Sequence, residues 1–307
     1  MMEGTIFSIN ISEQKGTSKY SVSSAEVDDY GIKGDAHAGK WHRQISMLSH
    51  ESARKFSDDS GVQINSGDFA ENLLVEGMDL SGVSVMDEFI CGNVRLQVTQ
   101  IGKKCHGDNC TVYSRVGKCI MPKEGIFARV LSGGLISAGD RITLNKRLFR
   151  IKIITVSDSA SENIYEDISG KVIFSKLEEH FSHMTYKTEM ERIVIPDDIK
   201  IIENVLAESS SFDLIVTNGG TGVGPRDVTP EAAMSFIDKE LPGVMDFVRN
   251  KHGDRLPSAL LSRSIAGIKG KTQLYCLPGS PKACVEYMDE ILRVIEHAFF
   301  MLHSIGH

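Results

Sequence analysis

The pattern of hydrophobic and polar positions differs between the two halves of the chain. Up to about residue 144, Gly, Asp and Asn separate short strand-like runs, which lie at 4–12, 43–49, 94–102 and 141–145. Many short strands with frequent turn residues predict a β-rich barrel with few helices. One helix is expected at about 49–59, where Ser49 is a suitable N-cap.

From Ile151 onward, strand-like runs alternate with longer helical stretches. The strands are predicted at 151–156, 213–218 and 273–279, and the helices near 168–181, 198–209, 230–240 and 282–302. This alternation predicts an α/β domain with a mostly parallel sheet flanked by helices. The last helix carries an apolar face, expected in the core, at Met288, Ile291, Ile295, Ala298, Phe299 and Leu302. The change of pattern at about 145–150 predicts two domains, residues 1–147 and 148–307.

Composition narrows the class of protein. With 41% hydrophobic and 24% charged residues, the 307-residue chain is typical of soluble globular proteins. The net charge of −7 disfavours a general nucleic-acid binder. No apolar run approaches transmembrane length, and the first residues lack a signal-peptide pattern, so we expect a cytoplasmic protein without membrane attachment. Six cysteines are too few for a disulfide scaffold, and reduced thiols are expected.

The most distinctive stretch is 214–232, LIVTNGGTGVGPRDVTPEA. A buried strand is expected to run into a glycine-rich turn and then into a helix, with Thr229 as N-cap and Pro230 as its first residue. Backbone N–H groups of such a turn can approach an anion closely, which suits a phosphate, although a tight turn without a ligand is the alternative. The stretch lacks the Lys of a Walker A loop, and Pro225 interrupts the dinucleotide-binding pattern.

GGTGVGPRDVTPEA, taken with ITVSDSAS (154–161), IPDD (195–198), LSRSIAGIKG (261–270) and LPGSPKA (277–283), resembles the molybdopterin-binding Mog/MoaB family. The resemblance covers roughly residues 150–303. It implies a molybdopterin adenylyltransferase that uses Mg²⁺ and ATP, releases pyrophosphate and assembles as a trimer. It assigns Mg²⁺ to Asp197 and Asp227. It assigns pterin or nucleotide contacts to Asp158, Gly219, Gly220, Thr221, Gly222, Ser262, Pro278, Gly279 and Ser280.

The residues themselves leave alternatives open at two of these positions. Asp197 or Asp198 could be no more than the N-cap of the following helix. Ser262, without the resemblance, is a surface serine on a helix. The family often has Arg where this chain has Ser159, and the basic residues that could replace that guanidinium are Arg226, Lys269 and Lys282.

The first half resembles a MOSC domain, a β-barrel module associated with the molybdenum cofactor and its sulfur chemistry. The resemblance lies in 28–49, 67–77 and 98–142, and it marks Cys105 as the residue that binds sulfur or molybdenum. A thiolate suits a soft metal and carries sulfane sulfur, and Lys103, Lys104 and His106 would lower its pKa.

Other residues of this half have competing interpretations. His42 and Arg43, with His37, could form a basic rim for a pterin phosphate or be structural, and Trp41 is interpreted as packing. The Cys-x₄-Cys spacing of Cys105 and Cys110, without a second pair, disfavours zinc. Cys110 and Cys119 could instead be small buried hydrophobic residues.

The two resemblances together predict a protein of molybdenum cofactor biosynthesis, whose first half binds, sulfurates or hands on the cofactor. Its partners would be molybdopterin, ATP and other molybdenum cofactor enzymes. The alternatives are a non-catalytic cofactor carrier and a partner in molybdate insertion.

Overall fold

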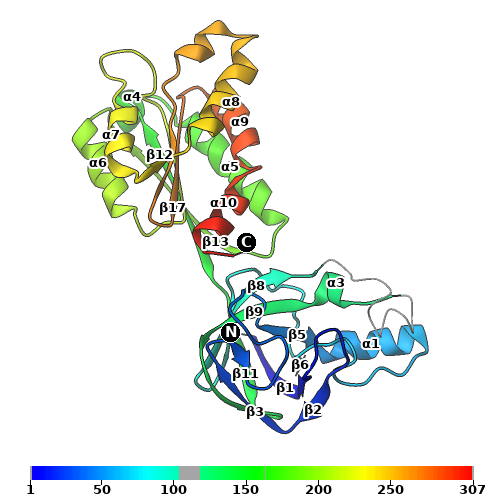
Figure 1. Ribbon diagram of the computed structural model, residues 1–307. Helices are drawn as coiled ribbons and strands as arrows, with labels where there is room; N and C mark the ends of the chain where they lie inside the picture. The colour runs from blue at the N-terminus through cyan, green and yellow to red at the C-terminus, as the bar shows by residue number, and fades with distance from the viewer. Residues whose placement is uncertain (1, 104–117, 163, 306–307) are drawn as a thin grey trace. The chain divides into compact units, whose positions relative to one another are not determined.

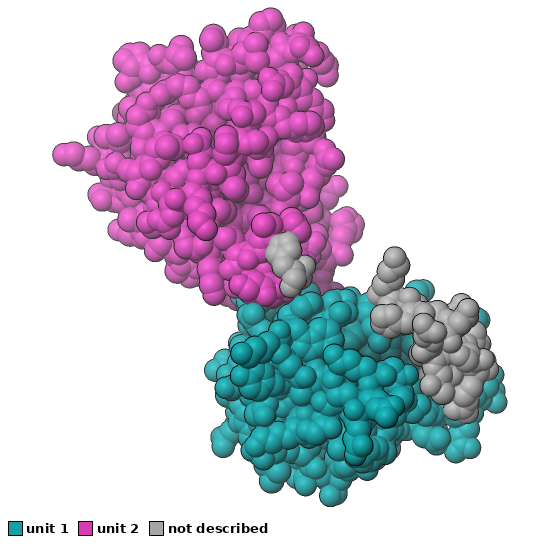
Figure 2. Space-filling model, in the orientation of Figure 1, with its two compact units in different colours: residues 1–147, 306 teal, residues 148–305, 307 magenta. Residues whose placement is uncertain are grey.

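The computed structural model describes residues 2–103, 118–162 and 164–305. The chain divides into two compact units, with the division between Arg147 and Leu148 (Figures 1 and 2). Each unit has its own hydrophobic core.

The first unit is a closed seven-stranded β-barrel, which confirms the predicted β-rich barrel. Around the ring the strands are β1 (Met2–Ile11), β6 (Leu73–Glu76), β5 (Ile45–Ser49), β9 (Ile126–Ser132), β8 (Val94–Ile101), β7 (Glu88–Cys91) and β11 (Arg141–Asn145), which pairs again with β1. All neighbours in the ring are antiparallel except β5 and β6. The barrel interior is apolar because strand side chains alternate, so that residues such as Ile6, Val75 and Phe89 point inward.

Smaller elements complete the barrel. β2 (Tyr20–Val22) extends the sheet beside β1, and a second sheet contains β10 (Gly134–Ser137), β3 (Ser24–Asp28) and β4 (Gly31–Ile32). The helices are α1 (His50–Ser60) and the short α3 (Met121–Glu124). The Ser49 hydroxyl accepts a hydrogen bond from the Ser52 N–H over 3.2 Å, which confirms the predicted N-cap.

The second unit is an α/β domain with a six-stranded mixed sheet. The strand order is β13 (Lys187–Ile195), β12 (Leu148–Val156), β14 (Leu214–Asn218), β17 (Thr272–Leu277), β16 (Ala266–Lys269) and β15 (Lys239–Glu240). The first four strands are parallel, and β16 and β15 are antiparallel to their neighbours. The fold class predicted for this half is confirmed.

Helices cover both faces of this sheet (Figure 1). α6 (Ile199–Glu208) and α7 (Thr229–Phe236) lie on one face, and α5 (Ile168–Ser182), α8 (Pro242–Gly253), α9 (Pro281–Ile291) and α10 (Ile295–Leu302) on the other. Short helices α4 (Asp158–Ser161) and η2 (Pro257–Leu261) lie in connections. No helix in the described ranges combines the length and apolar character needed to cross a membrane.

The single helix predicted at 282–302 is wrong, because the structure has α9 and α10 there. The break is a tight turn in which the Val294 N–H donates to the Ile291 carbonyl over 2.9 Å. Such a turn preserves the helical spacing, so Met288, Ile291 and Ile295 are buried as expected and the sequence pattern does not reveal the break. The helix predicted at 230–240 ends at Phe236, before β15.

Candidate functional site

The glycine-rich turn begins where β14 ends, at the carboxyl edge of the parallel strands. Gly219 and Gly220 have φ angles of 99° and 62°, which favour glycine. Neighbouring atoms also leave no room for a side chain at these two positions. A Cβ on Gly219 would lie 2.1 Å from the Val156 carbonyl oxygen of β12, and one on Gly220 would lie 2.4 Å from the Thr229 hydroxyl. The main chain of the turn therefore packs closely against the end of β12 and the start of α7.

Thr229 has a different role from the expected N-cap. Val228 precedes the first residue of α7, and no side chain caps this helix. The Thr229 hydroxyl instead donates to the Gly219 carbonyl over 2.9 Å, and its N–H donates to the Gly220 carbonyl over 3.1 Å. Thr229 thus fastens the glycine turn to the start of α7, and Pro230 is the second residue of the helix.

The turn forms one wall of a hollow of about 460 Å³. Eight of the residues assigned to the site by resemblance line this hollow: Gly220, Thr221, Gly222, Asp227, Ser262, Pro278, Gly279 and Ser280. Other lining residues, among them His252, Leu256 and Tyr287, have no signal in the sequence that marks them. Gly219 lies behind the lining, next to Gly279.

Two aspartates flank the turn through a reciprocal contact. The Asp158 N–H donates to Asp197 Oδ2, and the Asp197 N–H donates to Asp158 Oδ1, both over 2.9 Å. The N-cap of α6 is Asp198, whose Oδ1 accepts from the N–H groups of Lys200 and Ile201. Capping therefore does not explain Asp197. Burial raises the pKa of Asp197, and the negative charges of Asp158 and Asp227 act in the same direction.

Asp227 lies on the glycine loop itself. Its Oδ2 accepts from the Gly224 N–H over 2.8 Å, and a Cβ on Gly222 would lie 2.7 Å from the same oxygen. Across the described residues, no three His, Cys, Asp or Glu side chains gather in an arrangement that would hold a metal ion by themselves. Asp197 and Asp227 fit the more open kind of Mg²⁺ site, in which one or two carboxylates act with phosphate oxygens of a substrate.

No sequence pattern marks Arg263, yet it joins the loop to the segment that carries Ser262. Its Nε donates to the Gly222 carbonyl over 2.7 Å, and its Nη2 donates to the Asp227 carbonyl. Its Nη1 pairs with Glu231. The arginine is part of the LSRS sequence. Its contacts depend on the fold, because the loop that it contacts lies about forty residues earlier in the chain.

The LPGS loop is braced from behind. The Ser169 hydroxyl donates to the Gly279 carbonyl over 2.6 Å, and the Cys284 thiol donates to the Pro278 carbonyl over 3.3 Å. Ser280 is the N-cap of α9 and accepts from the Ala283 N–H. These contacts fix the loop that faces the glycine turn.

The three basic residues considered as replacements for a guanidinium at position 159 differ in place. Arg226 Nη1 lies 3.2 Å from Asp158 Oδ2, so it is next to the aspartates. Lys269 pairs with Asp238 over 2.8 Å and lines a separate hollow beside α6, so its expected role at the site is wrong. Lys282 is exposed in the first turn of α9.

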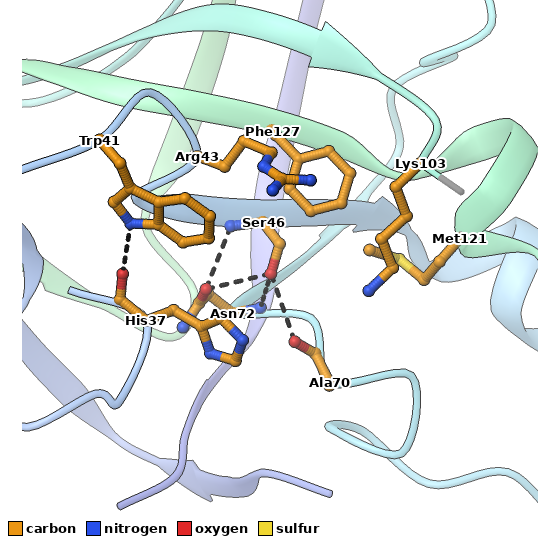
Figure 3. Close-up of a pocket in the computed structure, with 9 residues that line it drawn as sticks. All are labelled: His37, Trp41, Arg43, Ser46, Ala70, Asn72, Lys103, Met121 and Phe127. Atoms are coloured by element: carbon orange, nitrogen blue, oxygen red, sulfur yellow. Dashed lines mark hydrogen bonds between the residues drawn. The ribbon is translucent and has the colours of Figure 1, made fainter. Parts of the chain in front are cut away.

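The barrel has its own small pocket, of about 80 Å³ (Figure 3). It is lined by His37, Trp41, Arg43, Ser46, Ala70, Asn72, Lys103, Met121 and Phe127. The Arg43 guanidinium lies 4.9 Å from the centre of the Trp41 ring, and Lys103 Nζ lies 5.8 Å from the centre of the Phe127 ring. Trp41 is expected only to pack, but it forms part of a pocket that is lined by two cationic side chains, Arg43 and Lys103.

Of the two histidines considered for a basic rim, His37 lines this pocket and His42 does not. Nδ1 of His42 is buried and has no hydrogen-bond partner in the described ranges. Burial lowers the pKa of His42, and the charges of Arg43 and Arg129 lower it further. This pKa shift favours a neutral His42, whereas Arg43 and Lys103 line the pocket with cationic side chains.

The predicted sulfur or molybdenum ligand, Cys105, lies outside the described residues, as do Lys104, His106 and Cys110. Cys119 is half-buried and packs against a hydrophobic cluster that includes Leu48, Phe69 and Met121. This environment agrees with the interpretation of Cys119 as a small hydrophobic residue.

Comparison with known proteins separates the same two halves. Residues 152–297 match the family of probable molybdopterin binding domains, and residues 34–143 match the MOSC domain. A molybdopterin adenylyltransferase of Helicobacter pylori is 36% identical over 150 residues, which are 48% of this chain and 84% of the relative. The molybdopterin adenylyltransferase of Escherichia coli is 35% identical over 158 residues, 49% of this chain and 80% of the relative.

Among solved structures, the molybdopterin biosynthesis enzyme MoaB from Thermus thermophilus is 36% identical. The match covers 51% of this chain and 97% of that protein, with a TM-score of 0.45. The sequence matches carry the assignment: the chain belongs to the molybdopterin-binding domain family through its second half and has a MOSC domain in its first half.

Proposed function

We propose that the second half transfers the adenylyl group of ATP to molybdopterin and releases pyrophosphate, as a step of molybdenum cofactor biosynthesis. The observation that carries this proposal is the convergence of Gly220–Gly222, Asp227, Ser262 and Gly279–Ser280 around one hollow. The similar proteins of Helicobacter pylori and Escherichia coli, both named molybdopterin adenylyltransferase, support the same activity.

The reaction forms a bond between a terminal phosphate oxygen of molybdopterin and the α-phosphorus of ATP. The bond from that phosphorus to the bridging oxygen breaks, and pyrophosphate leaves with the electron pair. A phosphate nucleophile is already ionised near neutral pH, so the protein has to position reactants and stabilise charge rather than supply a nucleophile.

The residues that line the hollow, together with Asp197 and Ser264 nearby, suit that task. Main-chain N–H groups of Gly220–Gly222 would donate hydrogen bonds to phosphate oxygens, as those of glycine turns before a helix do. The hydroxyl oxygens of Ser262 and Ser264 lie 2.7 Å apart, so one of them can donate to the other and leave a donor for substrate. Asp197 and Asp227 would hold Mg²⁺, which when bound supplies positive charge to the phosphates.

The test is incubation of purified protein with ATP, Mg²⁺ and molybdopterin. We expect pyrophosphate and adenylyl-molybdopterin in equal amounts. Tight binding of molybdopterin without pyrophosphate release would point to a carrier. Consumption of already adenylylated pterin with molybdate would point to molybdate insertion. Either result would replace the proposed activity.

For the first half, we propose that the barrel pocket binds the phosphate end of the cofactor and that Cys105 carries its sulfur or molybdenum. Arg43 and Lys103 support this proposal because they supply two cations to a pocket large enough for a single oxyanion. Arg43→Gln should weaken cofactor binding to the barrel without changing adenylylation. Unchanged binding in this variant would refute the proposed anion site.

We further propose a cytoplasmic trimer that passes its product to other enzymes of molybdenum cofactor metabolism. The support is the resemblance to the Mog/MoaB family. Light scattering on the purified chain tests the trimer, because a monomer mass would contradict it.

A further inference from the structure

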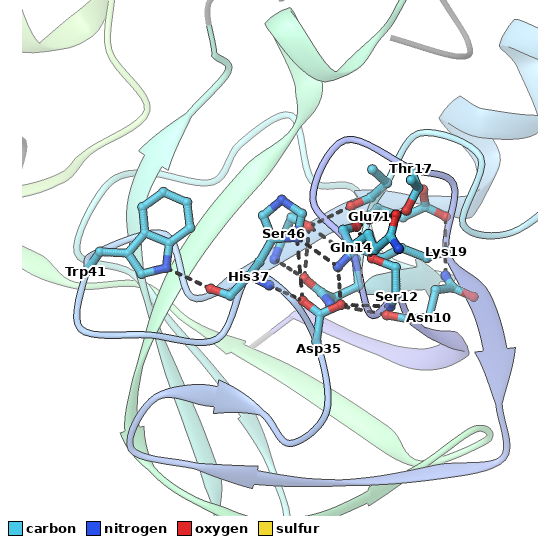
Figure 4. Close-up of polar contacts among 12 residues, drawn as sticks. Asn10, Ser12, Gln14, Thr17, Lys19, Asp35, His37, Trp41, Ser46 and Glu71 are labelled. Atoms are coloured by element: carbon cyan, nitrogen blue, oxygen red, sulfur yellow. Dashed lines mark hydrogen bonds and ion pairs between the residues drawn. The ribbon is translucent and has the colours of Figure 1, made fainter. Parts of the chain in front are cut away.

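A lysine and an aspartate form a fully buried ion pair beside the barrel pocket (Figure 4). Lys19 Nζ lies 2.5 Å from Asp35 Oδ1, and their side chains are 0% and 1% exposed. Burying two charges costs more than burying apolar side chains of similar size, so a buried ion pair is weak evidence for a stabilising role. The contacts that the pair makes with its surroundings indicate another role.

The Asp35 carboxylate organises the segment that leads to the pocket. Its Oδ1 accepts from the Ser12 N–H and its Oδ2 accepts from the His37 N–H, each over 3.0 Å. Burial by itself would raise the pKa of Asp35, but the nearby imidazole of His37, the ammonium group of Lys19 and the Ser12 N–H outweigh it and hold the pKa well below its ordinary value. Asp35 is therefore a carboxylate. Burial lowers the pKa of Lys19, but the hydrogen bond to Asp35 over 2.5 Å and the negative charge of that carboxylate favour its ammonium form.

The same ammonium group reaches the imidazole of His37. Lys19 Nζ lies 3.4 Å from His37 Nδ1, and Asp35 Oδ2 lies 3.6 Å from that nitrogen, beyond hydrogen-bond distance. An ammonium group can only donate, so Nδ1 has to accept. In a neutral imidazole that accepts at Nδ1, the proton is on Nε2.

We infer that Lys19 is a positioning residue that holds His37 in the tautomer with its proton on Nε2, so that the barrel pocket offers an N–H donor from His37. The ring of His37 lines the pocket together with Arg43 and Lys103 (Figure 3). A pocket with this tautomer would present three donors to a tetrahedral oxyanion. This consequence for binding rests on the proposed anion site, whereas the tautomer itself does not.

The tautomer can be measured in the full chain without a ligand. Two-bond ¹H–¹⁵N correlation spectra of ¹⁵N-histidine-labelled protein distinguish the two neutral forms, and a His37→Gln variant assigns the signals. The measurement is made at about pH 8, above the ordinary imidazole pKa of about 6.5. We expect the Nε2–H form in the wild-type protein. The Nδ1–H form would overturn the inference, because Asp35 and not Lys19 would then set the ring.

The variant that tests the cause is Lys19→Met combined with Asp35→Asn, which removes both buried charges and keeps an oxygen at position 35 to accept a backbone N–H. Circular dichroism and a thermal melt establish that it folds. We expect the fraction of the Nε2–H form to fall, because the group that donates to Nδ1 is gone. Lys33→Met is the matched control, because Lys33 lies in the same unit but is 51% exposed and pairs with Glu26. A preference unchanged in the double variant would overturn the inference.

Inorganic phosphate is the binding probe for the consequence. Its affinity, followed by the shift of the His37 signals, should fall about tenfold in the double variant, the effect of losing one hydrogen bond to an anion. Affinity unchanged despite a changed tautomer would refute the role of His37 as a donor. If phosphate does not perturb the His37 signals of the wild-type protein, the proposed anion site fails while the tautomer assignment stands.

Discussion

Asp158 and Asp197 each donate a main-chain N–H to the other's carboxylate over 2.9 Å, so each residue fixes the other. They follow the ends of neighbouring parallel strands, β12 and β13, which brings the two residues together at one edge of the sheet. One oxygen of each carboxylate accepts the reciprocal hydrogen bond. The other oxygen of Asp197 lies 3.4 Å from the position that a Cβ on Gly220 would take, so it faces the glycine turn.

This arrangement predicts that Asp197→Asn removes activity but not the fold. Asparagine can still accept the N–H of Asp158 through its carbonyl oxygen, while the charge needed for Mg²⁺ is lost. We expect adenylylation to fall by roughly a hundredfold or more, as for other lost electrostatic contacts in active sites. Asp227→Asn should behave in the same way. Pyrophosphate release and molybdopterin binding are measured together.

The control for Asp197 is its neighbour. Asp198→Ala removes the α6 N-cap and should lower stability by about 1 kcal/mol with adenylylation kept. Near-normal turnover in both Asp197→Asn and Asp227→Asn would exclude the assigned roles. Loss of folding in Asp197→Asn would show that its role is structural.

The glycine loop is tested most cleanly at Gly222. Its φ is not in the left-handed region, so alanine adds a methyl group without backbone strain. That methyl group would lie 2.7 Å from Asp227 Oδ2 and push the carboxylate away from the Gly224 N–H. We expect calorimetry to show weakened ATP binding. Gly243→Ala is the matched control, because nothing lies within 4 Å of its added methyl group. Equal affinity in the two variants would show that the loop is only a turn.

The sequence predicts correctly those features that depend on residues close together in the chain. The glycine turn, the buried strand before it and the Ser49 cap each depend on residues a few positions apart, so the pattern predicts them. The sequence pattern does not indicate β13, because this edge strand is mostly polar and resembles a connecting segment. Arg263 was missed because its contacts with Gly222 and Asp227 join segments that are distant in sequence.

The sequence also does not show which of two nearby residues of the same type has a given role. Asp197 and Asp198 both suit an N-cap, and only the backbone geometry assigns the cap to Asp198. His37 and His42 lie in one polar loop, and only the fold directs His37 to the pocket. Most of the assignments that came from family resemblance, such as Ser262, line one hollow, whereas Asp158, Asp197 and Gly219 do not line it.

Arg263→Lys should lower kcat more than it raises KM. Lysine keeps the charge but cannot contact both the Gly222 and Asp227 carbonyl oxygens, since it lacks the planar fork of a guanidinium. We expect kcat to fall about tenfold to a hundredfold, the equivalent of one charge-assisted hydrogen bond. Glu231→Gln removes only the half-exposed contact to Arg263 and should leave kcat nearly unchanged. An equal effect of both variants would contradict a positioning role for the guanidinium.

Glu71 makes the stability of the barrel depend on pH. It is fully buried, Oε2 has no partner among the described residues, and burial raises its pKa from 4.5 to about 7, against the hydrogen bond from the Gly67 N–H. The folded state therefore binds the proton more tightly. The stability from this proton is complete below pH 4.5 and is lost as the pH rises through about 7.

Glu71→Gln should remove this dependence, because glutamine imitates the protonated acid. Between pH 5 and pH 8 the wild-type barrel should lose on the order of 3 kcal/mol relative to the variant. Trp41 is the only tryptophan and lies in the barrel, so its fluorescence during denaturation reports this unit. Glu26→Gln, at a side chain 59% exposed, is the control. Parallel pH profiles of wild type and Glu71→Gln would show that Glu71 stays ionised.

The last prediction concerns Cys105. A cysteine that carries sulfur or ligates molybdenum has to be reachable and prone to ionise, whereas a core thiol is inert. The comparison thiols are well defined: Cys91, Cys276 and Cys284 are buried, and burial raises their pKa values to about 11, 12 and 12. Lys103 and Lys104 next to Cys105 in the sequence favour its thiolate.

Alkylation of the native protein with iodoacetamide, followed by peptide mass spectrometry, should therefore label Cys105 before Cys91, Cys276 and Cys284. Bound cofactor should protect it. Cys105→Ser should abolish sulfur or molybdenum loading and leave pyrophosphate release unchanged, because the two activities are assigned to separate units of the chain. If Cys105 resists alkylation in the native protein, or if one zinc ion copurifies and is lost on mutation of Cys105, Cys110 or Cys119, the residue is not a sulfur carrier.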